Sequence, residues 1–163
     1  MREGELLALT LADVDFERKG IFVRHSYARL NGEDVISDPK TRRSKRFITV
    51  PDFLLEIIRE YAAKLYEYQP EERLFECTKY WLKEQLERCC QRTGVKVIRV
   101  HDIRHSHASL LINMGTDALL VQQRLGHEKV STTLGTYAHL YPDRANNVAD
   151  RLEALACPEE KKP

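Results

Sequence analysis

The chain has 163 residues, a mass of 19.0 kDa and a formal net charge of +1; 42% of its residues are hydrophobic and 31% are charged. This length predicts one domain that can bury a core without metal or disulfide staples. The composition excludes a disordered or collagen-like chain, and no apolar stretch approaches the roughly 20 residues that a membrane span needs. Since no signal-peptide pattern is visible either, we expect a cytoplasmic protein with no membrane partner.

The first third of the chain predicts a short helix followed by a small sheet. Residues 4–12 form the predicted helix, and the Asp13–Val14–Asp15 stretch ends it. Asn31 and Gly32 are typical of a hairpin turn. Short apolar runs predict three strands, at residues 21–23, 35–36 and 47–50. Together they indicate a small three-stranded antiparallel sheet near the N-terminus.

The remainder of the chain predicts helices. Apolar residues recur at helical spacing between Leu54 and Leu65. Ser131 is a candidate N-cap, because its hydroxyl can accept from free backbone N–H groups. Further helices are expected over residues 80–92, 102–114, 117–125 and 143–156, with Gly94, Gly115 and Gly126 just after the first three. The predicted fold class is therefore α+β and mainly helical.

Cysteine and histidine spacings do not predict a metal site. The chain holds four cysteines, Cys77, Cys89, Cys90 and Cys157. They lack the paired short spacings of a zinc site, and we expect them to be reduced and structural. His101, His105 and His107 are close together, but only the first two have ligand spacing and no acidic or cysteine partner is evident. His101 with Asp102 leaves open a metal phosphohydrolase, which would need further ligands.

Basic residues gather in two stretches although the net charge is near zero. The first has no acidic residue and contains Lys40, Arg42, Arg43, Lys45 and Arg46. The second, residues 88–104, sets five basic residues against Asp102. A solvated loop would explain either stretch alone. If the two converge on one face, they make a phosphate-binding surface.

The segment HDIRHSHAS places His101 and Arg104 on one face of a helical turn. Arg104 offers a planar fork of N–H donors for two phosphate oxygens, and His101 titrates near neutral pH. His127 follows a glycine that ends a helix, where histidine is often a turn residue. Tyr137 comes ten residues later and Tyr141 one helical turn after that. Spacing alone makes neither phenol a nucleophile.

The order of the motifs is more informative than any one of them. An arginine-x-x-glutamate-leucine box at Arg2, Glu5 and Leu6 comes first, and Lys40 follows within DPKTRRSKRFITVP. HDIRHSHAS, LGH and STTLGTYAHLY then follow. From about residue 2 to 142, this series resembles the catalytic domain of the tyrosine recombinases, the phage integrase family.

The resemblance implies an integrase-like catalytic domain over residues 1–157 and a disordered tail over 158–163. It also implies that the first helices of that domain and an N-terminal core-binding domain are missing. We therefore expect this chain to be a fragment, with weak or no recombination by itself.

The resemblance further implies a set of catalytic residues, namely Arg2, Lys40, His101, Arg104, His127 and Tyr137. Tyr137 matches the nucleophile, which would form a 3′-phosphotyrosyl bond and free a 5′-hydroxyl. Arg2, Arg104 and His127 would stabilise the transition state, and Lys40 would protonate the leaving oxygen. His101 would act as a base or orient the phosphate. The family's reaction uses no metal and no other cofactor.

Supporting residues follow from the same resemblance. Flanking phosphates would be bound by Arg42, Arg43, Lys45 and Arg46. Glu5 is either a supporting residue or a helix-surface carboxylate, and His105 and His107 are expected to be packing or helix-face residues. Residues 143–156 would join protomers into a tetramer on double-stranded DNA or pack on their own domain, and a monomer is the alternative without DNA.

Two other functions stay open beside a site-specific recombinase. One is a truncated, catalytically inactive DNA-binding module. The other is relaxation of supercoils by the same tyrosine chemistry, as in type IB topoisomerases.

Overall fold

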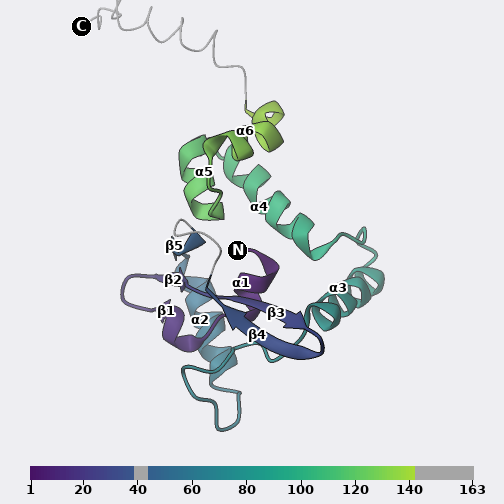
Figure 1. Cartoon of the computed structure of the whole chain (residues 1–163). Coiled ribbons are helices and arrows are strands. Elements are labelled where there is room, and N and C mark those ends of the chain that lie inside the picture. Colours follow the sequence, from purple (N-terminus) through teal and green to yellow (C-terminus); the bar gives the residue numbers. More distant parts are fainter. Residues whose placement is uncertain (39–43, 142–163) are drawn as a thin grey trace, which may run out of the picture.

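The computed structural model describes residues 1–38 and 44–141. Helix α1 and the strands lie on one side of the N-terminus, and α4, α5 and α6 lie on the other, with α3 linking the two groups (Figure 1). The strands are β1 (Val14–Asp15), β2 (Gly20–Val23), β3 (Ser26–Leu30), β4 (Glu33–Ser37) and β5 (Arg46–Thr49). The helices are α1 (Glu3–Leu7), α2 (Asp52–Ala62), α3 (Lys79–Thr93), α4 (Val100–Asn113), α5 (Ala118–Leu125) and α6 (Val130–Tyr137), with short 3-10 turns at Leu11–Asp13 and Ala138–Leu140. This arrangement confirms the mainly helical α+β class.

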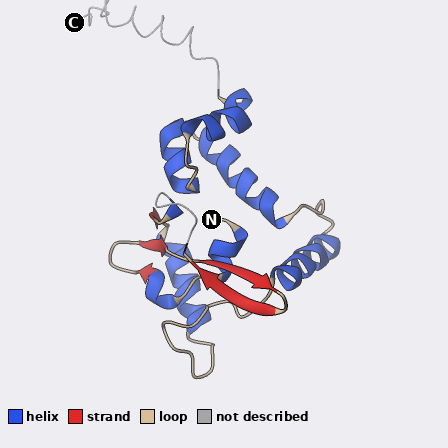
Figure 2. Ribbon diagram, in the orientation of Figure 1, coloured by secondary structure: helices blue, strands red, loops and turns tan. Residues whose placement is uncertain are grey.

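The strands form two antiparallel sheets rather than one (Figure 2). The three-stranded sheet has the order β1-β2-β5, and β3 pairs with β4 in a separate hairpin. The prediction that residues 35–36 belong to the three-stranded sheet is therefore wrong. Asn31 and Gly32, with φ of 52° and 87°, close a tight turn that pairs β4 with its immediate neighbour. The third strand of the larger sheet is β1, where we predicted only the end of a helix.

Glycines end the helices largely where the sequence predicts. Gly94 and Gly126 follow α3 and α5 and both have φ of 70°, a left-handed backbone that ends a helix without a Cβ penalty. The predicted helix over residues 4–12 is shorter, because Thr10 binds the Asp13 carboxylate and starts a 3-10 turn instead. The prediction for Ser131 is wrong, since α6 begins at Val130 and Lys129 is its N-cap.

Of the three buried clusters among the described residues, two hold the elements around the site together. One joins the three-stranded sheet to α2 and consists of Leu9, Val14, Ile21, Leu55 and Leu74. The other joins α4, α5 and α6 and consists of Ala108, Ile112, Val121, Leu125 and Tyr137. Tyr137 is only 4% exposed. The ring of the predicted nucleophile is thus part of the packing that fixes α6 against α4 and α5.

Some sequence predictions fall outside the described ranges, including the amphipathic segment 143–156 and Cys157. Within those ranges, Cys77, Cys89 and Cys90 are free thiols. None of the helices described combines the length and the apolar character needed to span a membrane.

Candidate active site

The C-terminal end of α5 receives three arginine side chains from other parts of the chain. Arg46 Nε donates to the carbonyl oxygen of Arg124 at 3.0 Å, Arg104 Nη2 donates to that of Leu125 at 2.7 Å, and Arg2 Nη2 donates to that of Gly126 at 2.9 Å. The last carbonyls of a helix have no donors within the helix and form the negative end of its dipole. Because these carbonyls are successive, the helix end gathers three positive charges that lie far apart in the sequence.

Glu5 is the carboxylate that holds two of these guanidiniums together. It is 3% exposed, so it is not the helix-surface carboxylate that the sequence left open. Arg46 donates to both of its oxygens, at 3.1 and 2.8 Å, and Arg2 Nη1 donates at 2.9 Å. Burial alone would raise the pKa of Glu5, but the hydrogen bonds from Arg46 and Arg2 outweigh it and lower this pKa to about 2. Glu5 therefore stays ionised and fixes α1 against β5.

The ionised form of Glu5 should make folding depend on pH. Because the folded pKa lies below the ordinary value, Glu5 adds stability above pH 4.5 that is lost as the pH falls towards 2. We expect Glu5→Gln to lower the free energy of unfolding at pH 7 by about 3 kcal/mol. The difference in the free energy of unfolding between the wild type and Glu5→Gln should narrow as the pH falls from about 5 to about 2. Chemical denaturation across this pH range measures this difference, and a difference that does not change with pH would contradict the ion pair.

Gly126 allows the close approach of Arg46 to the end of α5. A Cβ at this position would lie 2.7 Å from Nη1 and 2.9 Å from Cζ of Arg46. Gly94 has the same φ of 70° and open space around it, so it is a matched control. We expect Gly94→Ala to lower the free energy of unfolding by about 1 kcal/mol through the backbone alone. Gly126→Ala should lower it by about 1–3 kcal/mol more, because this substitution also displaces a buried guanidinium. Equal losses of thermal stability in the two variants would contradict the contact.

Arg104 keeps part of its binding capacity unused. Its side chain is buried, and Nη1 has no hydrogen-bond partner among the described residues. Burial, together with the charges of Arg2 and Arg46 and against that of Glu5, lowers the pKa of Arg104 to about 10. Arg104 is still charged at neutral pH. A buried cation with an unpaired N–H edge favours an anionic ligand at that edge.

His127 follows the arginine-capped end of α5 and is held from two directions. Its Nδ1 shares a hydrogen bond of 2.9 Å with Oγ1 of Thr133, and Gln122 donates to its backbone carbonyl at 2.8 Å. Burial lowers the pKa of His127 to about 4, and Arg104 and Arg2 act in the same direction. The imidazole is therefore neutral at pH 7, so it can act through a hydrogen bond rather than a full charge.

Tyr137 lies beside the arginine cluster and contacts a histidine of α4. Its hydroxyl is 2.5 Å from Nδ1 of His105. The ring of His105 meets that of His101 edge-on, with 4.7 Å between centroids. Burial raises the pKa of Tyr137, and the charge of Arg104 offsets part of this rise. At neutral pH the phenol is therefore protonated.

The structure brings together the predicted catalytic residues that it describes. Arg2, Arg104 and His127 meet at the end of α5. His105 links Tyr137 to His101, and the charge of Arg104 acts on both. Lys40 lies outside the described residues, as do Arg42 and Arg43.

The two described members of the basic stretch have different environments. Lys45 is exposed and donates to Asp38 at 2.7 Å. The side chain of Arg46 is 7% exposed and bound to Glu5. Arg46 is therefore not on the exposed surface that the predicted phosphate grip requires.

Three contributing residues were assigned other roles or none from the sequence. Arg46 was read as part of an exposed basic run, and His105 as a packing residue. Arg124 was not singled out, although its Nε donates to Nε2 of His107 at 3.1 Å and its Nη1 to the carbonyl of Thr49 at 2.9 Å. These bonds tie α5 to both α4 and β5.

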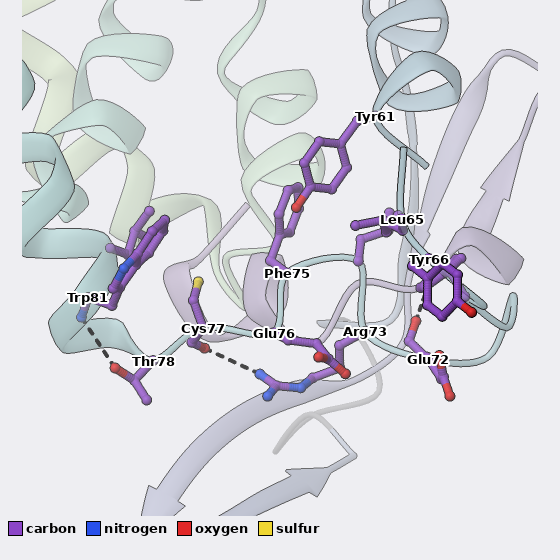
Figure 3. A pocket seen from close by; sticks show the side chains of 13 residues that line it. Tyr61, Leu65, Tyr66, Glu72, Arg73, Phe75, Glu76, Cys77, Thr78 and Trp81 are labelled. Atoms are coloured by element: carbon purple, nitrogen blue, oxygen red, sulfur yellow. Dashed lines mark hydrogen bonds between the residues drawn. The ribbon is translucent and has the colours of Figure 1, made fainter. Parts of the chain in front are cut away.

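Two cavities are candidates for part of the active site, and only the smaller one adjoins it. One of about 360 Å³ has Arg2, His101 and Arg104 in its lining and opens beside the site. Another, of about 960 Å³, lies between the end of α2 and the start of α3, with Tyr61 and Trp81 in its wall (Figure 3). None of the described residues that we predict to be catalytic lines this second cavity, so we do not assign the chemistry to it.

Comparisons with known proteins agree with the motif order and the fold. The sequence model of the phage integrase family matches residues 1–144. The ICEBs1 integrase of Bacillus subtilis (strain 168) is 33% identical over 168 residues, which cover 95% of this chain and 46% of that protein. The chain thus spans about half the length of the curated relatives it matches.

Solved structures share the fold of this chain. The Tn1549 transposon integrase, in a complex with transposon right end DNA, is 26% identical with a TM-score of 0.77 over 94% of this chain and 55% of that one. The catalytic domain of bacteriophage HP1 integrase has 22% identity and a TM-score of 0.60, covering 98% of this chain and 79% of that one. The matched motifs, the fold and the family match together place this chain in the phage integrase family.

Proposed function

We propose that this chain is the catalytic part of a site-specific recombinase that cuts and rejoins double-stranded DNA in the cytoplasm through a 3′-phosphotyrosyl intermediate. The observation that supports it most is the buried Arg104, whose Nη1 has no partner among the described residues and whose charge acts on the phenol of Tyr137. A phosphodiester would supply the missing acceptor next to a nucleophile. The ICEBs1 relative and the DNA complex of the Tn1549 integrase support the same substrate class.

The roles follow from the chemistry of each group. Tyr137 attacks phosphorus, a bond forms from its oxygen to phosphorus, and the bond to the 5′-oxygen breaks. The phosphotyrosyl bond conserves the energy of the broken phosphodiester bond, so the strand can be resealed to another 5′ end without an external energy source. Arg2 and Arg104 stabilise the charge on the non-bridging oxygens, and neutral His127 adds a hydrogen bond. Lys40 protonates the leaving oxygen. The ring of His101 contacts that of His105, and His101 orients the phosphate or accepts a proton.

The remaining assignments are part of the same proposal. Residues 1–157 form the catalytic domain, and residues 143–156 join protomers into a tetramer on DNA. Lys45 binds flanking phosphates together with Arg42 and Arg43, as an electrostatic term that is independent of base sequence. We assign Arg46 a different role, which is to hold Glu5 and the end of α5 in place.

Cleavage can be tested without knowing the target sequence. A library of duplexes with a randomised centre is incubated with the chain and quenched with detergent, and DNA that stays attached to protein is recovered and sequenced over several rounds. We expect enrichment of one site with wild-type protein and none with Tyr137→Phe. Salt-sensitive binding without attachment would contradict the proposal and favour an inactive DNA-binding module. Strand cleavage is the readout because it needs only one active site.

A further inference from the structure

We propose that His105 receives the phenolic proton of Tyr137 during strand cleavage, an inference that rests on the recombinase activity proposed above. The family resemblance implies no role in the reaction for this histidine. His105 is nevertheless the side chain whose ring nitrogen contacts the nucleophile, with 2.5 Å between Nδ1 and the phenol oxygen. The two atoms are therefore in direct hydrogen-bond contact, as a general base and the group it deprotonates must be.

The packing of α4 and α6 fixes this contact. His105 lies on α4 and Tyr137 at the end of α6, and both helices share a buried cluster that includes Ala108 and Ile112. The ring planes of His105 and Tyr137 are tilted by 55°, with 5.7 Å between centroids. The two rings are therefore held by the core and do not depend on an exposed loop.

The phenol needs an acceptor. Burial raises the pKa of Tyr137, so the free phenolate is scarce at neutral pH. The groups whose charges interact with His105 are Asp102, His101 and His127, and Tyr137 contacts it directly. Asp102 lies one turn earlier on α4, and its pKa of about 2, set by hydrogen bonds from Arg99, keeps it ionised. Asp102 therefore places a negative charge one helical turn from the ring that receives the proton.

The step balances within the groups already named. The O–H bond of Tyr137 breaks, and its proton moves to Nδ1 of His105. The phenol oxygen forms a bond to phosphorus as the bond from phosphorus to the 5′-oxygen breaks, and that oxygen takes its proton from Lys40. In rejoining, Lys40 takes the proton of the attacking 5′-hydroxyl, the 5′-oxygen bonds to phosphorus as the bond from phosphorus to the Tyr137 oxygen breaks, and His105 returns its proton to the departing phenolate.

Two substitutions at His105 separate proton transfer from positioning. In His105→Asn the amide oxygen can still accept a hydrogen bond from Tyr137 but cannot take a proton, whereas His105→Phe keeps only the ring. Single-turnover cleavage of the duplex selected above should fall about 10²-fold in both variants. Wild-type cleavage by His105→Asn would overturn the proposal. His139→Asn changes an exposed histidine two residues from Tyr137 and should cleave at the wild-type rate.

A modified substrate identifies which proton transfer is lost. A 5′-bridging phosphorothiolate has a thiolate leaving group that needs no protonation. The defect of Lys40→Ala should therefore disappear on this DNA, while the defect of His105→Asn should persist. Rescue of His105→Asn by the sulfur substrate would overturn the proposal, because it would place the defect at the leaving group.

Nitrogen NMR of the free 163-residue chain tests the same contact without DNA. A hydrogen-bond acceptor at Nδ1 requires the tautomer with the proton on Nε2. We expect this tautomer for His105 and a shift of its Nδ1 resonance in Tyr137→Phe. A proton on Nδ1 would overturn the proposal.

The two proposals fail in different ways. Absence of any adduct at Tyr137 in the wild type contradicts the recombinase function. A normal wild-type adduct together with normal cleavage by His105→Asn contradicts only the role of His105.

Discussion

Tyr137→Phe is expected to abolish the covalent protein–DNA adduct entirely while leaving noncovalent DNA affinity unchanged. Phenylalanine keeps the ring that packs between α4, α5 and α6 but lacks the oxygen that would bond to phosphorus. The lost hydrogen bond to His105 should lower the free energy of unfolding by only about 1 kcal/mol. Denaturing electrophoresis with labelled DNA measures the adduct, and a filter-binding titration measures the affinity.

Tyr141→Phe is the matched control for this experiment. Tyr141 lies four residues further along the chain and packs against the same cluster. The Tyr141→Phe variant should form the covalent protein–DNA adduct at the wild-type level. An adduct that survives Tyr137→Phe but disappears in Tyr141→Phe would reassign the nucleophile.

Arg104→Lys is expected to slow cleavage by about 10²–10³-fold, although it preserves the charge. The guanidinium donates from Nη2 to the carbonyl of Leu125 and leaves Nη1 for a ligand. A lysine ammonium is a compact point charge and cannot reproduce this planar fork. Single-turnover cleavage at saturating protein separates the loss of rate from weaker binding.

Arg88→Lys makes the same exchange at an exposed helix position. Arg88 is 60% exposed on α3 and pairs with Glu84 one turn away. Its replacement should leave cleavage unchanged. Equal cleavage by Arg104→Lys and wild-type protein would mean that the buried fork does not bind the scissile phosphate.

Local signals predicted the ends of α3 and α5 because each of these helices is followed by a glycine with a left-handed backbone. Gly94 and Gly126 adopt a left-handed conformation that is costly for other residues, so their positions limit α3 and α5 in any tertiary context. Local signals specify the N-terminal ends of helices more weakly. Ser131 has a side chain suited to an N-cap, but the N-cap of α6 is Lys129, two residues earlier.

Strand pairing was harder to predict, because it depends on partners distant in sequence. Residues 35–36 have the apolar character of a sheet strand, and nothing local excludes pairing with β2. The tight turn at Asn31 and Gly32 directs β4 onto β3 instead, and β5 becomes the neighbour of β2. The two-residue strand β1 is too short to give a periodic signal.

The roles of Arg46 and His105 were missed although spacing held a signal for each. Arg46 lies two residues before buried Ile48 on β5, so strand alternation puts both on the inward face. His105 follows His101 by one helical turn and shares its face. The charge of Arg46 suggested an exposed residue, and its buried partner, Glu5, is 41 positions away. Contacts of this separation are set by tertiary structure rather than by sequence pattern.

Peptide mapping tests most directly whether Tyr137 carries DNA through a 3′-phosphate. The covalent complex with the selected duplex is digested with nuclease and trypsin, and the modified peptide is sequenced by mass spectrometry. Our account predicts a nucleotide 3′-phosphate on the oxygen of Tyr137 and a free 5′-hydroxyl on the other DNA end. A nucleotide on any other residue, or a linkage through a 5′-phosphate, would contradict it.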